Sequence, residues 1–169
     1  LLPRAIGNLP KLIDSARKAG CLVVFIQAIY DAVYISDAYA ARLDKRGIFG
    51  KICQAGTFGA DFFGDIRPYP GPREVIVTKH RFSAFWGTDL DLILSSNGIK
   101  TVVASGVATS VCVESAVRDA FFNDYNVVVA EDACADYVQA SHDAALAAMS
   151  RSFGEVVSSE TIIKKWVGE

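Results

Sequence analysis

Cys112 is the side chain in this sequence that is best placed to act as a nucleophile. Residues 101–103 form a short β-branched run that is typical of a buried strand, and residues 106–110 form a turn after it. The apolar residues that follow have the spacing of one helix face: Val113, Ala116, Val117, Ala120 and Phe121. The pattern predicts a strand, a turn and a helix, with Cys112 in the first helical turn.

The start of a helix is a favourable environment for a reactive thiol. Unpaired backbone N–H groups and the positive end of the helix dipole gather there, and they lower the pKa of a thiol. The same N–H groups could hold the oxyanion that forms when a thiolate attacks a carbonyl. Taken alone, however, Cys112 could equally be a small core residue in a turn between a strand and a helix.

Polar or reactive side chains follow four of the predicted strands. They are Gln27 after strand 21–26, Lys79 after strand 74–78, Cys112 after strand 101–103 and its turn, and Asp132 after strand 126–130. In open parallel sheets, ligands bind outside the carboxyl ends of the strands. Because these four side chains should meet at that edge, their convergence favours Cys112 as a nucleophile over a core role.

A cysteine nucleophile needs a base or a cation beside it. Lys79 and His80 are neighbours at a strand end, and neighbours in an extended strand point to opposite faces, so only one of them can easily face Cys112. His142 lies at a predicted helix start, where a satisfied surface histidine is expected. A lysine partner would favour the thiolate by its charge, and a carboxylate could take the proton.

Composition excludes several classes of protein. A chain of 169 residues with 51% hydrophobic residues can bury one core, so residues 1–169 are expected to form a single domain. The net charge of −2 without a basic stripe argues against a nucleic-acid partner, and the apolar runs are too short to span a membrane. Four cysteines without CxxC spacing, and no recognisable signal peptide, suggest reduced thiols in the cytoplasm.

The order of the elements predicts the fold class. Helices are expected at 8–19, 88–97, after Cys112, from Ser141 and near the end, and a weak strand at 155–157. Strands that alternate with helices in this way indicate an α/β fold with a mainly parallel sheet. Residues 28–73 show no strong period, and so long a connection is typical of a lid or a subunit contact, or otherwise of an exposed insertion.

Two segments carry a resemblance to a known family. Segment 106–119, GVATSVCVESAVRD, resembles the signature of the isochorismatase-like cysteine hydrolases, and TKHRFSAF at 78–85 followed by GTDL at 87–90 resembles their lysine segment. The stretch 8–27 and Asp132 also fit, so that the resemblance covers nearly the whole chain. The family includes nicotinamidases, N-carbamoylsarcosine and ureidoacrylate amidohydrolases, and isochorismatases.

The resemblance implies a fold and a set of catalytic groups. It implies a three-layer α/β/α, Rossmann-like architecture and an Asp–Lys–Cys triad in which Cys112 is the nucleophile and Lys79 the cation. It also implies a non-proline cis peptide bond at Val107–Ala108, with the N–H groups of Ala108 and Cys112 as the oxyanion hole. True isochorismatases lack the cysteine, so its presence favours hydrolysis of an amide or ureide through an acyl-enzyme.

The resemblance also bears on cofactors and substrate. Nicotinamidases carry an Asp-x-His metal motif after the strand that ends here at Gln27, whereas this sequence has QAIYD at 27–31, without a histidine. No other histidine spacing suits zinc or iron, and no glycine-rich nucleotide motif is present. The chain therefore looks most like the ureidoacrylate and N-carbamoyl amidohydrolases, without metal or cofactor, and a nicotinamidase is the alternative.

The expected substrate is a small amide or ureide, and the protein is expected to be a homo-oligomer, a dimer or a tetramer. The candidate substrate-binding residues are Gln27, as a hydrogen-bond partner of the substrate, and the aromatic residues Tyr30, Phe82, Phe85 and Trp86, as pocket walls. For each of the aromatic residues, core packing is an equally open interpretation.

The family places its catalytic aspartate on a first strand, ahead of the helix that is expected here from Asn8. The printed sequence begins at Leu1 without such a strand. We expect roughly 20–40 further residues upstream, the length of one strand and a loop, which carry an aspartate at the end of a short apolar strand. The alternative is a non-catalytic relative that lacks the acid.

Overall fold

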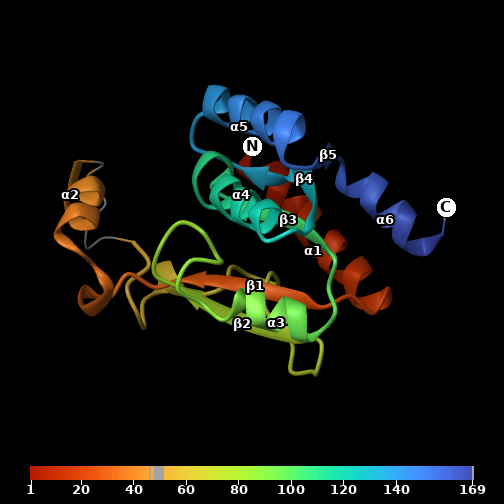
Figure 1. Cartoon of the computed structure of the whole chain (residues 1–169), viewed down its shortest axis with the longest axis horizontal. Coiled ribbons are helices and arrows are strands. Elements are labelled where there is room, and N and C mark those ends of the chain that lie inside the picture. Colours follow the sequence, from red (N-terminus) through yellow and green to blue (C-terminus); the bar gives the residue numbers. More distant parts are fainter. Residues whose placement is uncertain (46, 48–51, 169) are drawn as a thin grey trace.

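Strands and helices alternate along the chain in the computed structural model, which describes residues 1–45, 47 and 52–168 (Figure 1). The helices are α1 (Leu2–Lys18), α2 (Asp37–Lys45), α3 (Leu90–Ser96), α4 (Glu114–Phe122), α5 (Gln139–Ser152) and α6 (Ser159–Val167). The strands are β1 (Val23–Ala28), β2 (Glu74–Lys79), β3 (Thr101–Val107), β4 (Asn126–Ala135) and β5 (Glu155–Val157). Short 3₁₀ turns lie at η1 (Ala32–Tyr34) and η2 (Phe58–Ala60), and a π-helical turn, η3, at Thr109–Val113.

All strand pairs in this part of the chain are parallel, as predicted, and they form one sheet of two strands and one of three. β1 pairs with β2 from Val23↔Glu74 to Ala28↔Lys79. The second sheet has the order β3-β4-β5, and the register between β3 and β4 shifts between Ala104 and Gly106. Within the described residues, β1 and β3 therefore each have one strand partner and one free edge.

Helices cover both faces of the larger sheet and give the three-layer α/β/α arrangement. A small apolar cluster joins α1 and α6 to one face through Leu12, Ala130, Ala133 and Ile162. A larger cluster lies on the other face and includes Val117 of α4, Val129 of β4 and Met149 of α5, the last two with no exposed surface. Burying such apolar side chains contributes about 1.5–3 kcal/mol each.

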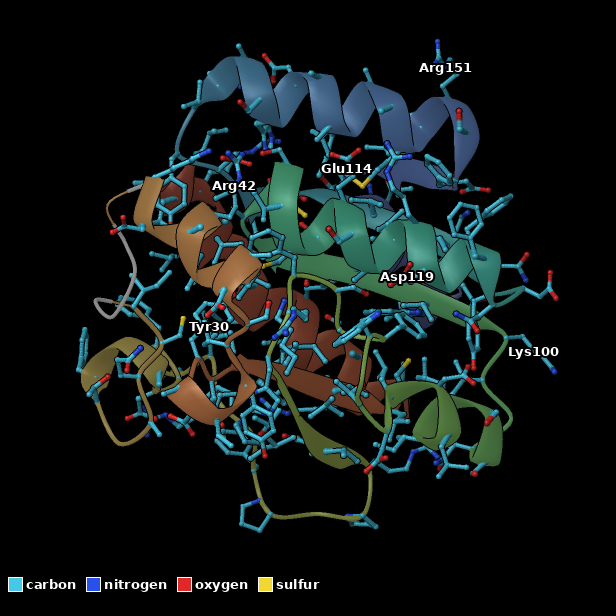
Figure 2. The ribbon with its side chains drawn as sticks, turned by 60° about the vertical axis from the view of Figure 1, so that its left-hand side comes forward. Tyr30, Arg42, Lys100, Glu114, Asp119 and Arg151 are labelled. Carbon is cyan, nitrogen blue, oxygen red and sulfur yellow. The ribbon has the colours of Figure 1, made fainter. Side chains whose placement is uncertain are left out.

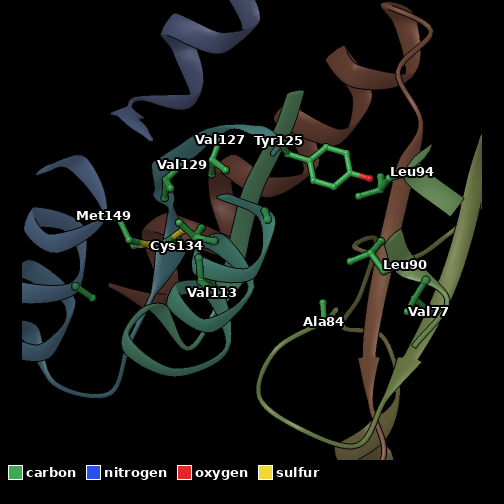
Figure 3. Packing of buried hydrophobic residues seen from close by; sticks show 13 residues of the cluster. Val77, Ala84, Leu90, Leu94, Val113, Tyr125, Val127, Val129, Cys134 and Met149 are labelled. Carbon is green, nitrogen blue, oxygen red and sulfur yellow. The ribbon is translucent and has the colours of Figure 1, made fainter. Parts of the chain in front are cut away.

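The larger cluster also joins the two sheets. It contains Val77 of β2 and Leu90 and Leu94 of α3, and Figure 3 shows the Tyr125 ring reaching from the β4 side towards Leu94. The Tyr125 hydroxyl donates a hydrogen bond to Asp91 Oδ1 at 2.8 Å, and burial, with this carboxylate, raises the pKa of Tyr125 to about 12. Side-chain packing, rather than a strand ladder, holds the sheets together here.

The first helix begins earlier than we predicted, at Leu2 rather than at Asn8. A proline lies in its first turn, where the backbone N–H that proline lacks would have no partner within the helix. Pro10 lies inside the helix instead of at its start. Asn8 is thus a helical residue and not a cap. Its amide Nδ2 donates to the carboxylate of Asp132 at 3.1 Å, which ties α1 to β4.

The strand that contains Asp132 is longer than we predicted, and this corrects the position of that carboxylate. β4 continues from Asn126 to Ala135, so Asp132 lies inside the strand and not after its end. Its carboxylate also accepts hydrogen bonds from the N–H and the hydroxyl of Ser159, at 2.7 and 2.9 Å. Because these donors satisfy a buried charge, Asp132 has a structural role between α1, β4 and α6.

The connection at 28–73 contains regular structure, in contrast to the expectation from its missing period. η1, α2 and η2 lie within it, and residues 46 and 48–51 are outside the described residues. In Figure 1, α2 projects from the body on the side towards which β1 points. No helix in the described ranges is long and apolar enough to cross a membrane.

Candidate active site

Cys112 lies in the π-helical turn that joins β3 to α4. The sequence pattern predicted the first turn of an α-helix here, but Val113 N–H bonds five residues back, to Ala108 O at 3.2 Å. The peptide bond Val107–Ala108 is cis, at the position to which the resemblance assigns one. The Ala108 N–H has no hydrogen-bond acceptor among the described residues, so it is available to a ligand.

The turn around Cys112 is anchored from the segments that follow β4. Ser110 N–H donates to Asp136 Oδ2 at 2.7 Å. Burial would raise the pKa of Asp136, but the hydrogen bonds from Ser110 and from Tyr137 N–H outweigh it and lower that pKa below its ordinary value. Asp136 is therefore a fixed anion at neutral pH that holds the turn.

His142 also supports this turn, which corrects its expected place on the surface. α5 begins at Gln139, so Ser141 lies within the helix rather than capping it, and the first turn of α5 packs on η3. His142 is only 4% exposed, and its Nδ1 lies 2.8 Å from Thr109 Oγ1, which is itself fully buried. His142 thus positions the backbone before Cys112.

Lys79 is the buried partner of the pair at the end of β2. It is 4% exposed, and its Nζ donates to the carbonyl oxygen of Phe82. His80 turns to the other side, where Nδ1 lies 2.7 Å from Ile29 O and the ring stacks on Tyr34 with centroids 3.6 Å apart. The alternation expected at this strand end therefore selects Lys79 as the residue directed into the protein.

Cys53, from the long connection, lies within electrostatic range of both Lys79 and Cys112. Burial raises the pKa of the Cys53 thiol, the charge of Cys112 raises it further, and the Lys79 ammonium opposes these effects. Its carbonyl oxygen accepts a hydrogen bond from Tyr30 N–H at 2.9 Å. These interactions place Cys53 in the same region as the expected nucleophile and its cation.

Aromatic rings line the same region. Tyr30 is 7% exposed, and its ring lies 5.8 Å from that of Tyr39, which lies 5.4 Å from Phe82. Burial raises the pKa of Tyr30, and the neighbouring Tyr39 hydroxyl and Cys112 add to the rise. In Figure 2, Tyr30 is seen below α2, the helix that carries Tyr39. Tyr30 and Phe82 thus belong to the neighbourhood of Cys112.

The other predicted substrate-binding residues are placed differently. Phe85 packs against the larger core cluster, with its ring 6.0 Å from Tyr125, so it has a core role. Trp86 is 62% exposed and contacts Arg81. The Gln27 amide donates to Ala60 O at 2.7 Å, a contact with the long connection.

Sequence reasoning missed three residues near the site, namely Tyr39, Cys53 and Arg81. Two of them come from the unpatterned stretch 28–73, where no periodicity could place them. Arg81 lies beyond the end of β2, in a bend of the chain, so strand alternation could not place it either.

No group of three or more histidine, cysteine, aspartate and glutamate side chains that could hold a metal ion occurs within residues 1–45, 47 and 52–168. The side chains around Cys112 are a second thiol, an ammonium, phenols and a phenyl ring. This set suits attack on a carbonyl by a thiolate.

We predict that iodoacetamide at neutral pH modifies Cys112 ahead of the other three cysteines. Burial raises the pKa of Cys21 and Cys53, and that of Cys134, which is 2% exposed, to about 12. At pH 7 these three groups are therefore thiols rather than the thiolates that react. Peptide mapping of partly alkylated protein measures the order, and Cys112 reacting last would contradict its role as nucleophile.

A family model described as the isochorismatase domain matches residues 2–161. Ureidoacrylate amidohydrolase RutB of Variovorax paradoxus is 36% identical over 140 residues, which make up 76% of this chain and 55% of that protein. The chain thus spans little more than half the length of this curated relative.

Solved structures share the fold over nearly the whole chain. An isochorismatase-like hydrolase from Alkaliphilus metalliredigens has a TM-score of 0.77 at 32% identity, covering 97% of this chain and 82% of that chain. N-carbamoylsarcosine amidase from Thermoplasma acidophilum has a TM-score of 0.75 at 28% identity, covering 94% of this chain and 86% of that chain.

Proposed function

The chain belongs to the isochorismatase family, and from this premise we propose that it is a cysteine amidohydrolase that cleaves a C–N bond in a small amide, ureide or N-carbamoyl compound. The observation that carries the proposal is that Cys53 lies within electrostatic range both of Cys112, in the turn that precedes α4, and of buried Lys79, at the end of β2. The similarity to an ureidoacrylate amidohydrolase and to an N-carbamoylsarcosine amidase supports this substrate class.

In the proposed reaction, Cys112 forms a covalent acyl-enzyme. The thiolate attacks the carbonyl carbon, a C–S bond forms, and negative charge moves to the carbonyl oxygen, where the N–H groups of Ala108 and Cys112 would stabilise it. When this intermediate collapses, the C–N bond breaks and the nitrogen leaves with a proton. Water then attacks the thioester, releases the acid and restores the thiol.

Lys79 and a proton carrier have separate tasks in this scheme. The Lys79 ammonium favours the thiolate by its charge, because it is buried and thus weakly screened by solvent. The proton of the thiol must reach the leaving nitrogen, and the resemblance assigns this transfer to an aspartate on a strand that precedes α1. That assignment, the homo-oligomeric state and the cytoplasmic location stay predictions.

Ammonia release from N-carbamoyl and ureido substrates tests the proposal. Mass spectrometry of protein quenched during turnover should show an acyl adduct on the peptide that contains Cys112. A protein that binds these compounds without releasing ammonia or forming the adduct would instead be a non-catalytic relative.

Activity is predicted to survive exhaustive chelation. The segment 27–31 offers no histidine, and the residues that contact the site region are thiol, ammonium and phenol groups. The rate of ammonia release before and after dialysis against EDTA and 1,10-phenanthroline measures this. Stoichiometric zinc or iron in the purified protein, with activity lost on its removal, would favour a nicotinamidase-type hydrolase.

A further inference from the structure

Arg81 is held beside the expected active site by one of its nitrogen atoms and by two aromatic rings. Nη1 donates to the carbonyl oxygens of Tyr34 at 2.8 Å and His80 at 2.7 Å. The guanidinium carbon lies 4.7 Å from the ring centre of Tyr39 and 5.3 Å from that of Trp86. These contacts fix the plane of the guanidinium group, which stacks well on aromatic faces.

One edge of this guanidinium group lacks a partner. Nε and Nη2 have no hydrogen-bond acceptor in the part of the chain that the structure describes, and no carboxylate there forms an ion pair with Arg81. The side chain is half-buried. The parallel N–H groups of Nε and Nη2 match the two oxygen atoms of a carboxylate. A fixed and unpaired cation with this geometry suits an anionic ligand.

A second unpartnered group lies next to Arg81. The Tyr39 hydroxyl is buried and has no hydrogen-bond partner among the described residues. Burying a polar atom without a partner is unfavourable, and a ligand that accepts its hydrogen bond would remove this cost. Burial raises the pKa of Tyr39, the neighbouring Tyr30 hydroxyl lowers it, Cys112 raises it and Arg81 lowers it. The Tyr39 hydroxyl thus lies near that of Tyr30, without hydrogen-bond geometry to it, and within electrostatic range of the nucleophile and of the guanidinium group.

We propose that the free Nε–Nη2 edge of Arg81, together with the Tyr39 hydroxyl, binds a carboxylate group of the substrate. This inference rests on the proposed function, since it names the substrate class of the same site: ureido or N-carbamoyl acids rather than neutral amides. The scissile carbonyl would lie at Cys112 and the carboxylate at Arg81. Arg81 is then the residue that determines selectivity for acids.

The test compares an acidic and a neutral probe, N-carbamoylglycine and its N,N-dimethylamide, which can release ammonia only from the carbamoyl group. Two quantities are measured for each: kcat/KM for ammonia release, and protection of Cys112 from iodoacetamide. The variants are Arg81→Gln, Arg81→Lys and Tyr39→Phe. Arg42→Gln is the matched control, because Arg42 is an exposed cation on α2, the helix that carries Tyr39 (Figure 2).

We expect Arg81→Gln to lower the preference for the acid over the neutral probe by about 10- to 100-fold, the usual range for hydrogen bonds to a charged group. Arg81→Lys should retain part of the preference, because lysine keeps the charge but lacks the two parallel N–H groups that match a carboxylate. Tyr39→Phe should lower the preference less than Arg81→Gln does. Arg42→Gln should change it less than about threefold, as expected for an exposed charge.

Several results would overturn the inference. An unchanged preference in Arg81→Gln is one, and an equal fall in Arg42→Gln is another, since that would indicate a general effect of charge. If Arg81→Gln fails to fold, Arg81→Lys carries the test, and full retention of the preference there would contradict bidentate binding. Failure of the proposed function is a separate outcome: neither probe is hydrolysed, but selective protection of Cys112 by the acid remains measurable.

Discussion

Replacing Cys112 with serine is expected to lower kcat/KM for an N-carbamoyl or ureido substrate by at least about 10³-fold. Serine keeps the size and the hydrogen-bonding capacity of the side chain, but its hydroxyl is far less acidic than a thiol. A lysine beside it, which favours a thiolate, cannot generate an alkoxide at neutral pH. The rate should therefore fall although the fold persists.

Cys21→Ser is the matched control for this variant. Cys21 lies just before β1, and burial raises the pKa of its thiol, so its loss should leave the rate within about threefold of the parent protein. Thermal melting of both variants separates loss of chemistry from loss of structure. If Cys112→Ser retained more than about one tenth of the activity, another residue would have to be the nucleophile.

Lys79→Met is expected to lower activity by about 10²–10³-fold and to slow alkylation of Cys112 at pH 7 by about tenfold or more. Methionine retains the apolar stem in a site that is 4% exposed, but it removes the charge that favours the thiolate. It also leaves the Phe82 carbonyl oxygen without its Nζ donor, which costs about 1–3 kcal/mol of stability. The pH profile of alkylation therefore has to be measured well below the melting temperature.

The neighbouring residue gives the discriminating control. His80→Ala loses the stacking on Tyr34 and the contact with Ile29 O, but it should affect the alkylation profile much less than Lys79→Met, because the ring is directed away from the Lys79 side. A larger effect of His80→Ala than of Lys79→Met would indicate a cysteine–histidine enzyme instead.

The sequence predicted best where a local pattern sets the direction of a side chain. Lys79 and His80 show this, because strand alternation leaves room for only one of them in the interior. The fold class followed from the alternation of strands and helices. The prediction of parallel strand pairing was confirmed, and in the described residues these strands form the ladders β1–β2 and β3–β4–β5.

Predictions failed where a distant contact outweighs a local preference. We placed Asp132 at a strand end because charged residues rarely lie inside a buried strand. In the structure, hydrogen-bond donors from α1 and α6 satisfy its carboxylate, so that β4 continues past it. Asp136, four residues later, is consequently the carboxylate that holds the Cys112 turn. Tyr39 and Cys53 could not be predicted, because they lie in a segment without periodicity and only the tertiary structure brings them to the site.

The separation of the two sheets has a consequence for how the site is maintained. Lys79 ends a strand of one sheet, whereas Cys112 follows a strand of the other. Each sheet with its helices is a candidate cooperative unit, or foldon, and contacts such as Tyr125 with Asp91 dock the two units. In the described part of the chain, the relative position of the expected nucleophile and its cation thus depends on side-chain contacts between the two ladders, so a substitution such as Tyr125→Phe, far from both groups, is expected to change the alkylation rate of Cys112.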